Sequence, residues 1–150
     1  QVLLKIKKVN PDSKLPSKNY NMDAGLDLYY DATANALPFY DGHVPLDTNE
    51  ITRLQTGICI EIPIGYCGII KDRSSLASEG IHVLGGVIDF GYTGEIIVVL
   101  TNVSKHIHTI YHGDKIAQLV ILPVPELSLQ LIAKLNNADR GEKGFGSSGK

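Results

Sequence analysis

Short apolar runs separated by turn-forming residues constrain this chain more than any other feature. Runs rich in Val, Ile and Leu, bounded by Gly, Pro, Asn and Asp, are typical of strands in an all-β sandwich or barrel. The pattern predicts strands over residues 2–7, 51–54, 57–62, 66–71, 94–102 and 116–122. At 150 residues the chain is long enough to bury a core as a single domain, residues 1–150.

Two segments depart from plain alternation. Residues 94–102 are apolar at both parities, which predicts a strand buried on both faces. Residues 74–79 are the one convincing helix, with Ser74 or Ser75 as its cap and Gly80 as its end.

Residues 136–150 are rich in Gly, Ser and charge, which predicts a mobile C-terminal arm unless something orders it.

Composition excludes several kinds of partner. The net charge of −2 gives no basic excess, so we expect no nucleic-acid partner. No apolar stretch reaches the about 18–20 residues of a membrane span, so we expect no membrane partner. Cys59 and Cys67 lack metal-ligand spacing and do not indicate a disulfide scaffold, which favours a reducing intracellular compartment such as the cytoplasm or nucleus.

Two early segments carry candidate chemistry. Asp23 and Asp27 flank Gly25 at a loop-to-strand junction, either as solvated turn acids or as carboxylates that reach a hard cation through water. Arg73 and Ser74 follow a strand and begin the predicted helix. That arrangement suits a phosphate, and a plain serine cap explains it equally well.

Two central segments combine glycines, an acid and an amide. Paired Gly85 and Gly86 allow close approach of the backbone to a ligand. Asp89 follows an apolar pair and precedes a turn, where it can activate a water or simply bond its own backbone. Gln118 lies in an apolar run and therefore needs a hydrogen-bonding partner, either backbone or ligand.

The last segment, residues 140–149, holds Arg140, two serines and the aromatic Phe145 among glycines. It resembles a phosphate-gripping loop but lacks the Walker spacing, and a disordered Gly/Ser tail is the simpler interpretation in isolation.

These five segments, in this order, resemble the five motifs of the trimeric dUTPase family from Leu15 to Gly149. The resemblance rests on the stretches 24–28, 73–77, 86–89 with Tyr92 and Gly94, 115–119, and 144–149. It implies a jelly-roll-like distorted barrel with one short helix and a flexible C-terminal lid. It also implies a homotrimer with sites at subunit interfaces and Mg²⁺-dependent hydrolysis of dUTP to dUMP and pyrophosphate. Such an enzyme limits uracil incorporation into DNA and supplies dUMP for thymidylate synthesis.

The resemblance assigns a role to each matched residue. Asp89 would orient the attacking water, Asp27 would reach Mg²⁺ through water, and Tyr92 would pack under the deoxyribose and exclude a 2′-hydroxyl. The backbone around Gly85, Gly86, Val87 and Ile88 would meet the uracil edge in a tight hairpin, together with Ile97. The remaining residues would hold the phosphates or close the site: Arg73, Ser74, Ser75, Gln118, Arg140, Phe145, Gly146, Ser147 and Ser148.

Some positions depart from the family pattern. Thr93 stands where many members have Arg, Phe90-Gly91 replaces a commonly acidic pair, and Asp72 replaces the usual Pro or Gly before Arg73. Two alternatives remain on the same fold. One is a dCTP deaminase, whose catalytic Glu would fall at Val99, and the other is a non-catalytic nucleotide-binding module.

Overall fold

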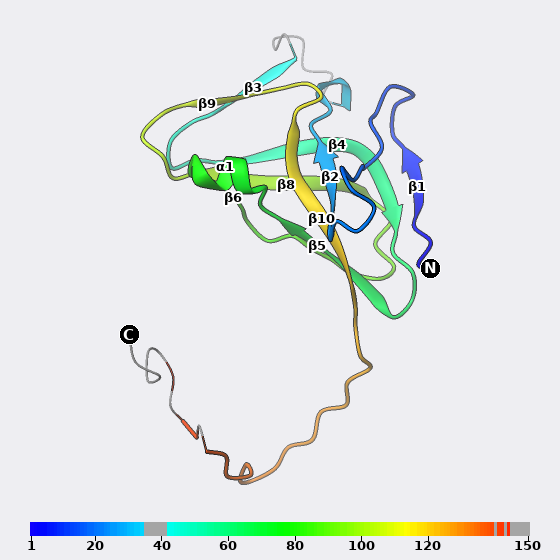
Figure 1. Ribbon diagram of the computed structural model, residues 1–150, viewed down its shortest axis with the longest axis vertical. Helices are drawn as coiled ribbons and strands as arrows, with labels where there is room; N and C mark the ends of the chain where they lie inside the picture. The colour runs from blue at the N-terminus through cyan, green and yellow to red at the C-terminus, as the bar shows by residue number, and fades with distance from the viewer. Residues whose placement is uncertain (35–41, 140, 143, 145–150) are drawn as a thin grey trace.

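The computed structural model describes residues 1–34, 42–139, 141, 142 and 144. Its strands and helices are β1 (Lys5–Lys8), β2 (Gly25–Tyr29), the 3₁₀ turn η1 (Ala32–Ala34), β3 (His43–Leu46), β4 (Ile51–Glu61), β5 (Tyr66–Lys71), α1 (Ser74–Ser78), β6 (Ile81–Val83), β7 (Val87–Ile88), β8 (Glu95–Asn102), β9 (His108–Tyr111) and β10 (Lys115–Pro123). All the strand pairs are antiparallel, so the chain folds as the predicted all-β domain with one short α-helix (Figure 1).

Two four-stranded sheets and a small ribbon make up the barrel. One sheet has the strand order β1-β4-β8-β6, the other has the order β2-β10-β5-β7, and β3 pairs with β9. The arrangement is the jelly-roll-like fold that the family resemblance implied. The packed interior is built from side chains that alternate inward along the strands: Leu28, Tyr30, Leu46, Leu54, Ile58, Ile60, Ile62, Ile70, Ile81, Ile96, Val98, Leu100, Ile110, Ile116, Ala117 and Leu119.

Several strand predictions need correction. Residues 51–54 and 57–62 form one strand, β4, because the chain bulges at Gly57 instead of turning there: the five residues of β4 from Gln55 to Cys59 oppose the three residues of β8 from Ile97 to Glu95. β1 begins at Lys5, so residues 2–4 precede it. The three short strands β3, β6 and β7 were not predicted, because two to four residues are too few to show alternation.

The prediction that residues 94–102 are buried on both faces is also wrong for the single chain. Ile96, Val98 and Leu100 are fully buried, whereas Ile97 and Val99 on the opposite face are half-buried. One face of β8 therefore packs on the core and the other faces outward.

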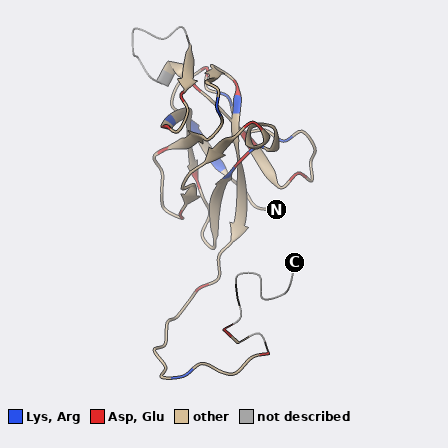
Figure 2. Ribbon diagram, turned by 90° about the vertical axis from the view of Figure 1, so that its left-hand side faces the viewer, with Lys and Arg blue, Asp and Glu red and all other residues tan. Residues whose placement is uncertain are grey.

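The chain leaves the barrel after β10, and the described residues beyond Pro123 run away from both sheets (Figure 1). Charged residues of both signs are interspersed over the barrel in the view of Figure 2. Among the described residues, no helix has the length and hydropathy needed to cross a membrane.

Candidate active site

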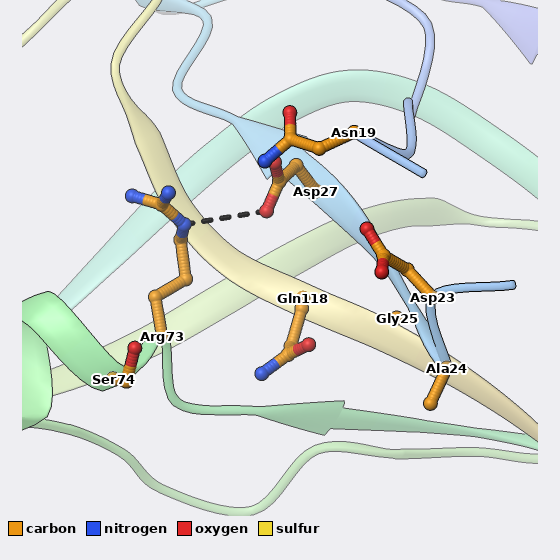
Figure 3. Close-up of a pocket in the computed structure, with 8 residues that line it drawn as sticks. All are labelled: Asn19, Asp23, Ala24, Gly25, Asp27, Arg73, Ser74 and Gln118. Atoms are coloured by element: carbon orange, nitrogen blue, oxygen red, sulfur yellow. Dashed lines mark hydrogen bonds and ion pairs between the residues drawn. The ribbon is translucent and has the colours of Figure 1, made fainter. Parts of the chain in front are cut away.

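A polar pocket lies where three segments that are distant in sequence meet (Figure 3). The β2 strand and the loop before it contribute one side, the loop between β5 and α1 another, and β10 the third. The lining residues are Asn19, Asp23, Ala24, Gly25, Asp27, Arg73, Ser74 and Gln118. Four residues that the sequence predicted to act together, Asp27, Arg73, Ser74 and Gln118, are thus brought together by the fold.

Asp27 is the centre of charge in this pocket. Its Oδ1 is 3.2 Å from Arg73 Nε, and its Oδ2 is 2.7 Å from Lys115 Nζ. The Asp27 side chain is only 15% exposed, so these ion pairs are less screened than surface pairs. Lys115 also donates to Asn19 Oδ1 at 3.2 Å. The pocket therefore combines cations that suit a phosphate with carboxylates that suit a hard metal ion.

The carboxylates of the pocket fit a weakly held Mg²⁺ better than a dedicated metal cage. Asp23 and Asp27 both line it, and no group of three or more His, Cys, Asp or Glu side chains that could hold a metal occurs among the described residues. Mg²⁺ commonly binds through one or two carboxylates, several waters and substrate phosphates. Asp23 also accepts the Tyr20 N–H at 2.9 Å, so the turn interpretation holds for that residue as well.

Gln118 is held in place by backbone. Its Nε2 donates to the Asp72 carbonyl at 2.7 Å, which supplies the partner that a polar residue in an apolar run requires. Register explains its position, because Gln118 pairs with Asp27 on β2 and with Lys71 on β5. Gly25 leaves room for it, since a β-carbon on residue 25 would overlap Gln118 Oε1.

The helix cap differs from the prediction. The N-cap of α1 is Arg73, in an extended conformation and without a side-chain capping bond. Neither Ser74 nor Ser75 caps the helix, because both already lie inside it. Gly80 ends it as predicted, with φ of 87° and its N–H bonded to the Ala77 carbonyl at 3.0 Å. Ser74 lines the pocket, whereas Ser75 is exposed outside the pocket lining.

The paired glycines carry the chain from one sheet to the other. Leu84 N–H still bonds the Val99 carbonyl of β8 at 2.9 Å. Gly85 and Gly86 then adopt φ of 66° and 102°, and the Gly86 carbonyl accepts the Ile70 N–H of β5 at 2.7 Å. The expected tight hairpin is therefore wrong in detail, because β6 pairs with β8 while β7 pairs with β5.

Because of this divergence, no described strand pairs with β8 at Ile97 on the β6 side, and this unpaired stretch of backbone is called the gap below. β6 pairs with β8 only over Leu100–Asn102, and the Val99 carbonyl points to the β6 side. Successive residues of a strand alternate their backbone direction, so the N–H and C=O of Ile97 point to that same side. Where the chain is level with Ile97, Gly85 and Gly86 have already turned toward β5. Ile97 thus presents backbone hydrogen-bonding groups toward the gap.

Asp89 lies away from the polar pocket. It is exposed and lines a different, largely apolar cavity with Ile64, Tyr66, Cys67, Phe90 and Val124. Ile88 pairs with Gly68, so Asp89 lies beside the start of β5, whereas Arg73 follows its end. Gly68, the partner of Ile88, and Arg73 are five residues apart along the chain, which corresponds to roughly 16 Å of extended backbone. A single chain therefore does not bring Asp89 to the pocket of Arg73.

The turn after Asp89 explains one departure from the family pattern. Tyr92 N–H bonds the Asp89 carbonyl at 3.2 Å, and Gly91 has φ of 88°. A positive φ at the third position defines a type II turn and favours glycine there. The Tyr92 ring folds back over Gly94, and its hydroxyl donates to the Glu95 carbonyl at 2.8 Å. Gly94 is required because a β-carbon there would lie 2.6 Å from that hydroxyl.

Five predicted residues, Arg140, Phe145, Gly146, Ser147 and Ser148, lie outside the described residues. The sequence also missed Asn19, which lines the pocket, and the ion pair of Lys115 with Asp27 beside it. Their part depends on the pairing of β10 with β2, which alternation along a single strand does not reveal.

The fold and pocket define a class of protein: a jelly-roll-like β domain with a polar pocket lined by aspartate, arginine, serine and glutamine side chains. The family model described as dUTPase matches residues 12–149. The chain belongs to the dUTPase family.

Relatives and solved structures agree with this assignment. The deoxyuridine 5′-triphosphate nucleotidohydrolase of Gloeobacter violaceus is 41% identical over 138 residues, covering 90% of this chain and 88% of the relative. That of Clostridioides difficile is 34% identical over 149 residues and 97% of each chain. A mutant of the Staphylococcus bacteriophage 80alpha dUTPase, solved with dUpNHpp, superposes with a TM-score of 0.83 at 27% identity over 99% of each chain. A phage phi11 dUTPase mutant, whose structure details the coordination of a structural Mg(II) ion, shares the fold with a TM-score of 0.74 at 24% identity, over 90% of this chain and 99% of that one.

Proposed function

We propose that this chain hydrolyses dUTP to dUMP and pyrophosphate by attack of water on the α-phosphorus. The observation that carries the proposal is the convergence of Asp27, Arg73 and Gln118 from three distant segments in one pocket. Family membership supplies the substrate, since the curated relatives act on deoxyuridine triphosphate. A dCTP deaminase would need a proton-transferring acid where this chain has Val99, and an apolar side chain cannot serve.

The pocket supports the assignment of the phosphates to this region. Arg73, Ser74, Ser75 and Gln118 would bind the phosphate chain, and Lys115 adds a second cation beside Asp27. Asp27 would hold the hydrated Mg²⁺. Bound Mg²⁺ would clamp the phosphate oxygens and offset their charge. The cations and hydroxyls would stabilise the charge that develops on the leaving pyrophosphate.

The water would be oriented and deprotonated by Asp89, and this requires a second copy of the chain. Asp89 lies roughly 16 Å along β5 from the level of Arg73, so a complete site would combine the pocket of one subunit with Asp89 of another. We therefore include the homotrimer with shared sites in the proposal.

Exposed apolar residues support association of subunits. Leu127, Leu129 and Leu131 occupy alternate positions after β10 and are 76%, 98% and 100% exposed. Alternation with period two is typical of a strand with one buried face, and this apolar row is unpartnered in the single chain. Burial of such a row against another subunit would remove it from water.

The gap beside Ile97 supports uracil recognition by backbone. Fixed N–H and C=O groups from Ile97 and from the Gly85–Ile88 segment would pair with the uracil edge and leave groups unpaired with a wrong base. Tyr92 would pack under the deoxyribose. Residues 136–150 would close over the bound nucleotide as a lid, with Phe145 over the base and with Arg140, Gly146, Ser147 and Ser148 around the terminal phosphate.

Hydrolysis of dUTP measured beside dTTP, dCTP and UTP, with and without Mg²⁺, tests the proposal directly. We expect pyrophosphate release from dUTP at a rate well above that from the other three nucleotides, and a large drop when Mg²⁺ is chelated. Ammonia release from dCTP would establish the deaminase instead. Tight nucleotide binding with no turnover would establish a non-catalytic module.

A further inference from the structure

Asp72 forms hydrogen bonds to residues well outside its own loop. It follows the last residue of β5 and precedes Arg73. Its Oδ1 accepts the Val83 N–H at 2.7 Å, and its Oδ2 is 2.9 Å from His82 Nδ1. A carboxylate can only accept, so this nitrogen of His82 carries the proton and donates it.

These bonds join the two sheets at the edge of the pocket. β5 belongs to the sheet β2-β10-β5-β7, whereas His82 and Val83 lie on β6 in the sheet β1-β4-β8-β6. The main-chain carbonyl of Asp72 also accepts the Gln118 amide of β10 at 2.7 Å. One residue therefore links β6, β10 and the loop that carries Arg73.

The direction in which Arg73 leaves β5 follows from these contacts. The peptide between Asp72 and Arg73 is planar, so fixing its carbonyl through Gln118 also fixes the orientation of the Arg73 N–H. The two hydrogen bonds between the Asp72 carboxylate and β6 fix the side chain of Asp72. Arg73 then extends toward Asp27 across the pocket (Figure 3).

The Asp72 carboxylate is suited to this role. Its side chain is 27% exposed, so its bonds are only partly screened by water. Burial by itself raises the pKa of Asp72, but the hydrogen bonds from His82 and the Val83 N–H outweigh burial and hold the pKa below its usual range. The group is therefore an anionic, double hydrogen-bond acceptor at neutral pH.

We propose that Asp72 is a positioning residue that holds Arg73 and Ser74 in the geometry required to grip the phosphate chain of the substrate. It takes the place of a proline or glycine that would fix or shape this turn by backbone constraint alone, and it does so through side-chain bonds to the neighbouring sheet. The inference rests on the proposed function, because it assumes that the pocket binds phosphates.

Binding of two ligands separates positioning from a merely structural role. Deoxyuridine carries no phosphate, whereas dUpNHpp carries the full phosphate chain and resists hydrolysis. We expect Asp72→Ala to weaken binding of dUpNHpp about tenfold, since small misplacements of binding groups are costly, while binding of deoxyuridine changes less than about twofold. kcat/KM for dUTP should fall in parallel with dUpNHpp binding.

Two further variants test whether Asp72 acts through its hydrogen bonds to β6. Asp72→Asn keeps an acceptor for the Val83 N–H and can pair with the other tautomer of His82, so it should restore most of the dUpNHpp binding. His82→Ala removes one of the two carboxylate bonds and should weaken dUpNHpp binding by about threefold. If Asp72→Ala does not fold, His82→Ala decides the question, because it leaves the Val83 bond intact.

A matched control is Glu79→Ala. Glu79 Oε2 is 3.2 Å from His108 Nδ1, another carboxylate–imidazole pair, but Glu79 is outside the pocket lining. This variant should bind both ligands as the wild type does. Equal weakening of both ligands by Asp72→Ala, or no weakening of either, would overturn the positioning role. A wild-type chain that neither binds dUpNHpp nor hydrolyses dUTP would instead refute the proposed function.

Discussion

The Gln118 side chain lies directly over Gly25, in the space that a β-carbon on residue 25 would occupy. The two residues are diagonal neighbours on adjacent strands, because β10 pairs with β2 in the register that brings Val120 beside Gly25 and Gln118 beside Asp27. Glycine at residue 25 is therefore a condition for the position of an amide in the pocket, in addition to any local role in the strand.

Gly25→Ala should displace Gln118 from its bond to the Asp72 carbonyl and lower kcat/KM for dUTP by about tenfold or more. The overlap should also destabilise the fold by about 1–3 kcal/mol. Chemical denaturation and steady-state kinetics measure the two effects. Gly25→Ala combined with Gln118→Ala should recover part of the stability but not the activity, because the overlapping amide is removed along with its function. Unchanged stability and activity in Gly25→Ala would contradict the packing relationship.

Subunit complementation tests the shared site. Asp89→Asn should nearly abolish turnover while nucleotide still binds, and Arg73→Ala should separately lose activity. Mixed trimers reassembled from equal amounts of the two variants should regain about a quarter of wild-type activity, because that share of random interfaces combines an intact Asp89 with an intact Arg73. Each variant reassembled alone is the control. No recovery on mixing would place both residues in the same subunit's site, and near-normal kcat in Asp89→Asn would reject its catalytic role.

Tyr92→Ala should relax discrimination against ribonucleotides. The ring that folds over Gly94 would no longer occupy the space beneath the sugar, so the ratio of kcat/KM for UTP to that for dUTP should rise by about tenfold or more. Tyr92→Phe serves as the control, since it keeps the ring and loses only the hydrogen bond to the Glu95 carbonyl. If the UTP-to-dUTP ratio rose as much in Tyr92→Phe as in Tyr92→Ala, the ring itself would not be the steric barrier.

The buried Asp31 should make stability depend on acid pH. It is 2% exposed, and it accepts the Ser13 hydroxyl at 2.6 Å and the Thr33 N–H at 2.9 Å. Burial raises the pKa of Asp31, but these hydrogen bonds outweigh burial and lower the pKa overall. The coulombic effect of His112, whose Nδ1 lies 3.8 Å from Asp31 Oδ1, also lowers the pKa of Asp31 but is the smallest of these causes.

The sign of the pH effect follows from that lowered pKa. The stabilisation is fully present above the unfolded carboxyl pKa of about 3.9 and is lost as pH falls through the lower folded value. Unfolding free energies measured from pH 6 to pH 3 should therefore fall more steeply in the wild type than in Asp31→Asn. Asp31→Ala should cost about 2–4 kcal/mol at pH 7, since the buried Ser13 hydroxyl and the part-buried Thr33 donors lose their partner. Parallel pH profiles for the wild type and Asp31→Asn would show that Asp31 is not the titrating group.

Truncation before Arg140 tests the proposed lid. The barrel strands all precede this point, so the shortened chain should keep its melting temperature and its oligomeric state. Hydrolysis of dUTP should become weak, because nothing would close over the nucleotide. Sedimentation and steady-state kinetics on the same preparation measure both properties. Full activity in the truncated chain would remove residues 140–150 from the mechanism.

Local sequence determined the strands with long apolar runs and the C-terminal end of the α-helix. β5, β10 and the helix end at Gly80 follow from residues adjacent in the chain, because alternation and glycine conformation act over a few residues. The resemblance to a family likewise named Asp27, Arg73 and Gln118 before any of them had been placed in space.

Tertiary structure alone decided which of these residues meet. Asp27 faces Gln118 because of the register of β10 against β2, and Asp72 reaches His82 because the loop after β5 meets β6 of the other sheet. The separation of Asp89 from Arg73 also comes from pairing, since β7 joins β5 at the end remote from the helix. Register and sheet packing depend on contacts between residues far apart in sequence, and a local pattern holds no information about those contacts.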